Sequence, residues 1–276
     1  MWTVLGFFLL LKSGHDNLEP TDRLIPVGYV GNPWGPTANE DRQRGVLPPL
    51  PLTPAMKGWD DWGKKTLQDG DLLFRRGDAR IFFGTFPVSR FIANFTSSRY
   101  SHTGTVLIED GEPYVYDMTK AGPRRQPFRV WILDNVHGLG VRRLRPECRG
   151  AIPKIREYLL SVYRSQIPFD YDLELDDSSL YCVEMAEKAF RAGGIVLSEP
   201  VRLGDLERAC DFPICVFVFS NTTSLNLEKC VYLPGNERNG QWSSPLMTTV
   251  YPLEETPRTA ESHRAPKPDA EMLTRD

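Results

Sequence analysis

A cysteine and a histidine are the residues of this chain whose types and settings suit nucleophilic chemistry. Cys182 begins the segment 182–192, which has a helical pattern, and His102 lies upstream in the strand-like segment 101–109. A thiol hydrolase needs a thiolate, a neighbouring imidazole and a third polar group that orients the ring. These groups meet in space whatever their order along the chain. The pair therefore predicts acyl chemistry on a cysteine.

A helix is predicted to carry Cys182. Apolar residues recur three, four, seven and eight positions after Cys182, and the pattern ends at Gly193. This spacing places Cys182 on the inward face of the first helical turn. Residues 177–179 are acceptable N-caps. The unpaired amides and the dipole at a helix start favour an anion, so we expect a lowered pKa for the thiol.

A β-hairpin is predicted to carry His102. Residues 101–109 and 112–118 are rich in strand formers and flank Asp110-Gly111, a pair typical of a two-residue type I′ turn. If Glu109 pairs with Glu112, Gly104 faces Asp117. Asp117 is then a diagonal neighbour of His102 at roughly 7 to 8 Å, a gap that two side chains can bridge. We therefore expect Asp117 to orient the imidazole.

Each of these residues taken alone has a simpler interpretation. A free cysteine is often a small buried hydrophobe, and a lone histidine or aspartate on a strand is often structural. Three independent local patterns support the site together. A metal site is not predicted, because the histidines at 15, 102, 137 and 263 are scattered and no zinc-binding spacing occurs. No cofactor is expected either.

Four segments, taken in order, resemble one known family. Residues 70–74, 98–104, 113–117 and 181–184 are similar to the permuted papain-like amidases of the YiiX and YaeF kind, within the NlpC superfamily. The resemblance covers about residues 66 to 220. It implies an α+β, circularly permuted papain-like (NlpC-type) fold in which an antiparallel sheet packs against helices. It also implies that His102 and Cys182 are the catalytic pair, with Asp117 where the family usually has glutamate.

The activity implied is hydrolysis of a peptide or acyl-amino amide bond through a thioester. A lipid acyltransferase or thioesterase with the same cysteine and histidine stays open, as does a non-catalytic relative that binds acyl or peptide ligands. The expected substrate is a peptide, an acyl-amide or a lipid-like molecule. Four further residues are candidates for substrate contact or loop support, and we favour capping and loop structure for the aspartates: Asp170, Asp176, Asp177 and Tyr181.

Charge argues against a nucleic-acid partner. The net charge is −3, and no basic stripe with interleaved aromatics is present. The pairs Arg124-Arg125 and Arg142-Arg143 are too short for such a stripe, and we interpret them as solvated strand or loop ends.

The chain divides into four predicted parts. Residues 1–17 contain an apolar run at 2–11 that favours a signal or anchor, and hence export or membrane association. A buried N-terminal segment in a cytoplasmic protein is the alternative. The proline-rich residues 18–57 are expected to form an extended linker or strap. Residues 58–233 are the expected catalytic domain, and residues 234–276 an expected disordered tail.

Within the domain, further elements are predicted from periodicity and composition. We expect strands at 71–76, 141–145 and 214–219, and helices at 88–95, 153–164 and 205–210.

Overall fold

A six-stranded antiparallel sheet is the centre of the computed structural model, which describes residues 21, 24–77, 88–135, 138–206 and 227–251. Its strands in sequence order are β1 (Leu72–Arg75), β2 (His102–Glu109), β3 (Glu112–Thr119), β4 (Gly122–Pro127), β5 (Leu139–Leu144) and β8 (Met247–Tyr251). Their order across the sheet is β4-β3-β2-β1-β5-β8. The sheet therefore ends at β4 on one side and β8 on the other.

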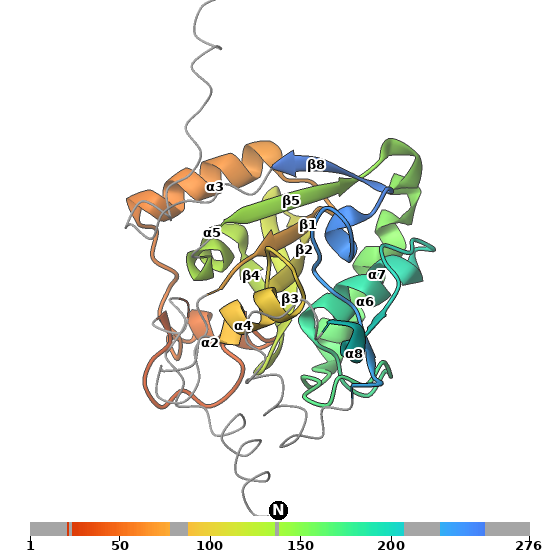
Figure 1. Ribbon diagram of the computed structural model, residues 1–276. Coiled ribbons are helices and arrows are strands. Elements are labelled where there is room, and N and C mark those ends of the chain that lie inside the picture. Colours follow the sequence, from red (N-terminus) through yellow and green to blue (C-terminus); the bar gives the residue numbers. More distant parts are fainter. Residues whose placement is uncertain (1–20, 22–23, 78–87, 136–137, 207–226, 252–276) are drawn as a thin grey trace, which may run out of the picture.

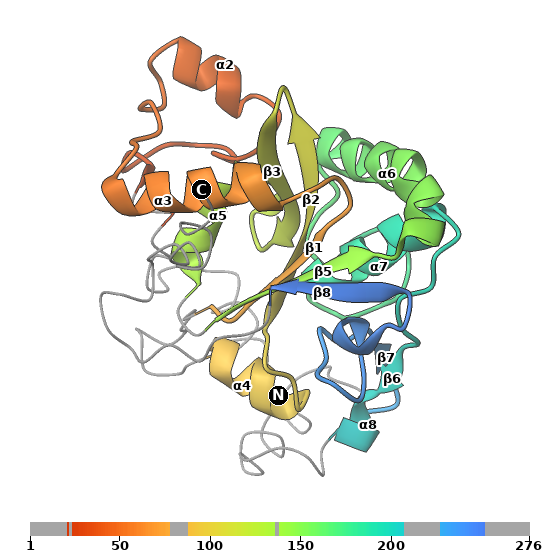
Figure 2. The same ribbon diagram turned by 90° about the horizontal axis from the view of Figure 1, so that it is seen from above.

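Helices cover both faces of this sheet (Figures 1 and 2). On one face, α6 (Ile152–Ser165) and α7 (Cys182–Ala192) pack against Leu72 and Phe74. On the other, α3 (Pro54–Thr66) and α5 (Phe128–Trp131) pack against Leu73. Successive residues of β1 thus point to opposite faces, and both sides are buried, which explains the apolar run Leu72–Phe74.

Short elements connect and extend these layers. They are α2 (Ala38–Gln43), α4 (Val88–Phe95), the 3-10 helices η2 (Ile132–Asp134), η3 (Pro146–Ala151) and η5 (Gln241–Ser243), the turn-length helix α8 (Leu203–Leu206), and β6 (Val201–Arg202) paired with β7 (Cys230–Val231).

Most of the predicted elements are confirmed. The helix at 88–95, the strand at 71–76, the helix at 153–164 and the strand at 141–145 are present with small changes at their ends. The antiparallel sheet packed against helices is confirmed as well. The short helix begins at Leu203 rather than at residue 205, and residues 207–210 lie outside the described part, as does the strand expected at 214–219.

Residues 18–57 were expected to form an extended linker or strap, and their described part fits the strap although it is not extended throughout. The described residues of this segment contain the helix α2, and α3 begins within it at Pro54. The Thr53 side chain caps α3 by accepting from the Met56 amide at 3.2 Å. Trp34, Leu47 and Met56 are buried. These anchors make the segment a strap held against the domain.

The expected disordered tail from residue 234 is wrong up to residue 251. Residues 241–243 form η5, and β8 pairs with β5 as the last strand of the sheet. Met247 and Trp242 are buried, so this segment contributes to the core although many of its other residues are polar. No helix within the described ranges is long and apolar enough to span a membrane.

Candidate active site

Cys182 is the first residue of α7, as predicted. The preceding residue, Tyr181, is the N-cap in an extended conformation, and its amide donates to the Glu184 carboxylate at 3.4 Å. The N-cap expected at 177–179 is therefore wrong, because a backward-reaching glutamate closes the helix start. The Cys182 side chain is half-buried. It lies among amides of the first turn that have no acceptor within the helix.

The hairpin has the predicted register. Glu109 pairs with Glu112, and Thr105 pairs with Tyr116, with the turn at Asp110 and Gly111. A Cβ added to Gly104 would lie 3.2 Å from the Asp117 Cβ, so the glycine leaves the room that the predicted contact needs. His102 and Asp117 consequently extend from the same sheet face.

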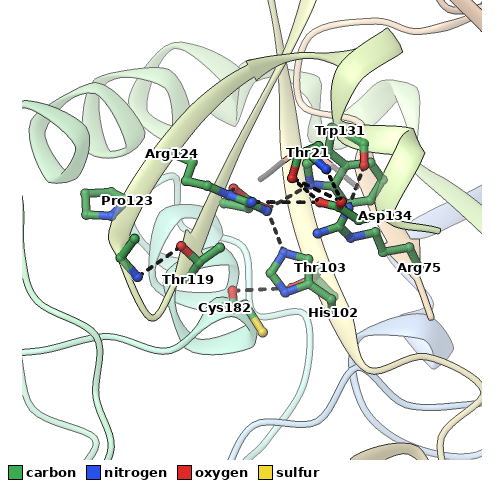
Figure 3. A network of polar contacts seen from close by, with 12 residues as sticks. Thr21, Arg75, His102, Thr103, Thr119, Pro123, Arg124, Trp131, Asp134 and Cys182 are labelled. Carbon is green, nitrogen blue, oxygen red and sulfur yellow. Dashed lines mark hydrogen bonds and ion pairs between the residues drawn. The ribbon is translucent and has the colours of Figure 1, made fainter. Parts of the chain in front are cut away.

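His102 and Asp117 are in direct contact. The His102 Nε2 lies 2.6 Å from the Asp117 Oδ2. The Cys182 side chain lies beside the same ring, from the start of α7 (Figure 3). With Nε2 engaged by the carboxylate, Nδ1 is the ring nitrogen left for the thiol. The structure thus brings together the three residues that the sequence selected.

The electrostatics of this group favour an ion pair. Burial opposes a charge on the His102 ring, but attraction to Cys182 and hydrogen bonds to Asp117 and Cys182 raise the pKa of His102 to about 9. Burial likewise opposes a thiolate, yet the charge and hydrogen bond of His102 outweigh it, and the pKa of Cys182 is lowered. Both shifts favour thiolate and imidazolium together.

Asp117 is held by groups that sequence reasoning missed. Arg124 binds its two oxygens through Nε at 3.0 Å and Nη2 at 2.7 Å, and the Trp131 indole donates to Oδ2 at 2.8 Å. Burial would raise the pKa of Asp117, but Arg124 and His102 hold that pKa well below its usual range. The carboxylate is therefore charged and fixed in place.

The interpretation of Arg124-Arg125 as solvated residues is wrong. Arg124 is 4 % exposed and is bound to Asp117. Arg125 forms an ion pair with Glu109 and lies over the Tyr114 ring. The two side chains point to opposite faces of β4. This strand has proline at its second and last positions, so its sequence is not typical of a strand.

The four weaker candidates support loops. Asp170 accepts from the amides of Asp172 and Leu173 at 2.8 and 2.9 Å. Asp176 accepts from the Ser178 amide, and Asp177 forms an ion pair with Lys188 of α7. The Tyr181 hydroxyl accepts from the Tyr232 amide at 2.6 Å, which joins the start of α7 to residues after β7. The preference for capping and loop structure at the aspartates agrees with these contacts.

Comparison with known proteins places the chain among relatives of similar fold. A family model described as permuted papain-like amidase, YaeF/YiiX, C92 family, matches residues 66–211. The YiiX protein of Escherichia coli K12, described as uncharacterized, is 24% identical over 188 residues, which span 66% of this chain and 85% of the relative.

A solved structure is similar to this chain as well. It is described as the metalloprotein yiiX of Escherichia coli O157:H7, and its TM-score to this chain is 0.55 at 25% identity. The alignment covers 69% of this chain and 99% of the solved chain. Because the family model matches more than half of the sequence, the chain belongs to the family of permuted papain-like amidases of the YaeF/YiiX type.

Proposed function

We propose that this protein is a cysteine hydrolase that cleaves an amide bond, in a peptide or an acyl-amino compound, through a thioester on Cys182. Membership of a papain-like amidase family supports a cysteine hydrolase in general. The contact between His102 and Asp117, with Cys182 beside the ring, is the observation that carries the finer proposal.

In the proposed reaction, the Cys182 thiolate attacks the acyl carbon and forms a carbon–sulfur bond. The His102 imidazolium then gives its proton to the amide nitrogen, the carbon–nitrogen bond breaks, and the amine leaves. A water molecule next loses a proton to the neutral ring and attacks the thioester. The carbon–sulfur bond breaks, which releases the acid and restores the thiolate and imidazolium.

The start of α7 supplies charge stabilisation in this scheme. The carbonyl oxygen becomes negative during each attack, and the Cys182 amide lies at the first position of the helix. An amide there has no acceptor within the helix and points along the helix dipole. It is therefore the natural donor to the oxyanion. Asp117 stabilises the imidazolium and fixes the ring without transferring a proton itself.

A resident metal ion does not fit this group of residues. The description of the solved relative as a metalloprotein applies to that protein. Here both Asp117 oxygens already accept from Arg124, and Oδ2 also accepts from Trp131 and His102. Across the described ranges, no three potential ligand side chains converge on one point. Cys182 and His102 alone fall short of the three protein ligands that a catalytic zinc usually has.

Mass spectrometry of the intact protein tests the proposed activity. The protein would be incubated with a panel of peptide amides, acyl-amino acid amides and lipid esters, and the reaction stopped with acid. We expect an acyl adduct on Cys182 with at least one amide, release of the free amine, and neither product with Cys182→Ala. A folded Cys182→Ala protein with wild-type specific activity would overturn the proposal.

The same panel separates hydrolysis from acyl transfer. With an added alcohol or amine acceptor, a hydrolase yields mainly free acid, whereas a transferase yields mainly the acylated acceptor. A non-catalytic relative would bind acyl or peptide ligands and form no adduct at all.

A further inference from the structure

A row of titratable side chains crosses four neighbouring strands and includes two residues of the candidate site. Arg75 of β1 is the register partner of His102 in β2, and Asp117 of β3 is the register partner of Arg124 in β4. Register partners extend from the same sheet face, and His102 contacts Asp117 on that face. The row therefore contains one side chain from each of the four strands. The next layer, α5 and η2, covers this row with Trp131 and Asp134.

Asp134 lies between the two arginines of the row. Its Oδ2 is 2.9 Å from the Arg75 Nη1 and 3.8 Å from the Arg124 Nη1, and the residue is 2 % exposed. Arg75 also donates to the Trp131 carbonyl at 2.5 Å and stacks on the Trp131 ring. The short contact fixes the direction of the Arg75 guanidinium, and the Asp134 charge attracts the Arg124 guanidinium across the longer distance.

The N-terminal strap completes this arrangement. Thr21 donates to Asp134 Oδ1 through its amide at 3.1 Å and through its hydroxyl at 3.0 Å, and its side chain is fully buried. Figure 3 shows Thr21 and Arg75 meeting at Asp134, with Arg124 extending toward the same group. A residue outside the segment that matches the family model thus reaches the group behind the candidate site.

The strap also fixes the backbone on both sides of Arg124. Asn32 donates to the Pro123 carbonyl at 2.9 Å, and the Trp34 carbonyl accepts from the Arg125 amide at 3.0 Å. Since β4 is the outermost strand on its side of the sheet, these contacts cover its otherwise open edge.

We propose that Asp134, supported by Thr21 of the strap, is a positioning residue that aligns Arg124 on Asp117 and so holds the His102 ring toward Cys182. The inference rests on the proposed function, and it extends the site to a part of the chain more than a hundred residues away in sequence.

Charge balance gives this role a measurable consequence. The groups that face His102 are Cys182 from α7, Asp117 and Arg124 from β3 and β4, and Arg75 with its partner Asp134 from β1 and η2. The charge of Arg75 already opposes a proton on the ring. Removal of the Asp134 charge leaves both guanidiniums less compensated, and the imidazolium becomes less stable.

NMR titration of the His102 ring in the full-length protein tests this proposal without relying on turnover. We expect Asp134→Asn to lower the pKa of His102 by about one unit. Thr21→Val should lower it in the same direction by a smaller, resolvable amount, because the carboxylate loses a donor. Thr21→Ser keeps the hydroxyl and should restore the wild-type titration.

Asp71→Asn is the matched control. Asp71 is equally buried and is bound by Arg143 at 2.7 Å, but it precedes β1 at the end opposite Arg75, about 13 Å along the strand. Its substitution should lower stability and leave the pKa of His102 unchanged.

Two results would overturn the positioning role. One is an unchanged pKa of His102 in a folded Asp134→Asn protein. The other is a wild-type titration in Thr21→Val, which decides the matter if Asp134→Asn does not fold. Neither depends on the reaction, because acylation of Cys182 in the wild-type protein is scored separately. If the wild-type protein is acylated normally and the pKa of His102 is unchanged in the variants, only the positioning role is refuted. If the wild-type protein is not acylated, only the proposed function is refuted.

Discussion

At the scale of single residues, Asp117 is the most constrained side chain of the site. It accepts from Arg124, Trp131 and His102 while it is almost completely buried. A carboxylate with this many donors cannot rotate freely, so it fixes the ring that it binds. The same contacts make Asp117 important for both reactivity and folding.

Asp117→Asn separates these two effects. We expect acylation to slow by several orders of magnitude, about 10⁴-fold if the site behaves like a serine-protease triad, because the imidazolium loses its counter-charge. Stability should fall by about 3–5 kcal/mol, since the buried Arg124 loses the carboxylate that it binds most closely. Single-turnover acylation would be measured at a temperature where the variant is folded.

Thr119→Val is the control for that substitution. Thr119 lies in the same strand, and its hydroxyl donates at 3.2 Å to the carbonyl of Gly122, the first residue of β4. Its loss should cost about 1 kcal/mol of stability and leave acylation unchanged. Equal, wild-type-like rates for both variants would exclude Asp117 from the proposed triad.

The pH dependence of kcat/KM follows from the two shifted groups. The reactive form has a thiolate on Cys182 and a proton on His102, so the rate should rise with pH through the lowered pKa of Cys182. It should fall again as the pH passes about 9, where His102 loses its proton. The two apparent pKa values of this pH profile describe the coupled Cys182–His102 pair rather than either residue alone. A rate that still rises above pH 9 would indicate a neutral thiol instead.

The sequence predicted the reacting residues but not the residues that hold them. Cys182, His102 and Asp117 each lie in a local pattern, a helix start or a hairpin, that can be recognised within about ten residues. Arg124 and Asp134 lie in segments with no such pattern. Arg75 lies in a predicted strand, but these three residues meet only because four strands align. Their contacts depend on tertiary structure, which spacing along the chain does not report.

At the scale of elements, the pairing of β2 and β3 positions the site. Gly104 lies in β2 where an added Cβ would be 2.5 Å from the Val115 Cγ1 and 3.2 Å from the Asp117 Cβ. Any larger residue there pushes the two strands apart at the level of the His102–Asp117 contact.

Gly104→Ala should therefore reduce both stability and acylation. We expect a loss of about 1–3 kcal/mol from overpacking, together with a slower reaction because Asp117 is displaced. Thermal unfolding and single-turnover rates would be compared with Gly150→Ala, whose added Cβ meets no atom within 4 Å. Wild-type acylation in Gly104→Ala would show that the close strand approach does not matter for the site.

Elements near the ends of the chain and at the edges of the sheet were harder to predict than the hairpin. The start of α3 does carry a recognisable signal, threonine at the N-cap followed by proline at the first position, but it lies in a proline-rich segment. The edge strands β4 and β8 form by pairing with β3 and β5. An outer strand pairs on one side only, so it needs no continuous apolar pattern that could be recognised in the sequence. The sequence therefore placed the central strands better than the outer ones.

At the scale of the whole molecule, the strap joins the N-terminal part of the chain to the domain. Thr21, Asn32 and Trp34 contact the domain beside or behind the candidate site. The apolar run at 2–11 precedes this strap, and we propose that it directs export or membrane association.

Cell fractionation tests the proposed location. Full-length protein should be recovered with membranes or outside the cytoplasm, whereas a version lacking residues 2–17 should be recovered in the soluble fraction. The shortened version keeps Thr21 and should therefore keep the wild-type His102 titration. Recovery of all full-length protein in the cytosol would contradict the proposed role of the apolar run.

Activation of Cys182 as a thiolate by His102 can be measured as the rate of Cys182 alkylation with iodoacetamide as a function of pH. Mass spectrometry of the labelled peptide distinguishes Cys182 from the other four cysteines of the chain. We expect an apparent pKa for Cys182 clearly below the free-thiol value of about 8.5, and a rise toward that value in His102→Gln. An apparent pKa at or above about 8.5 in the wild-type protein, unchanged by His102→Gln, would contradict activation by His102.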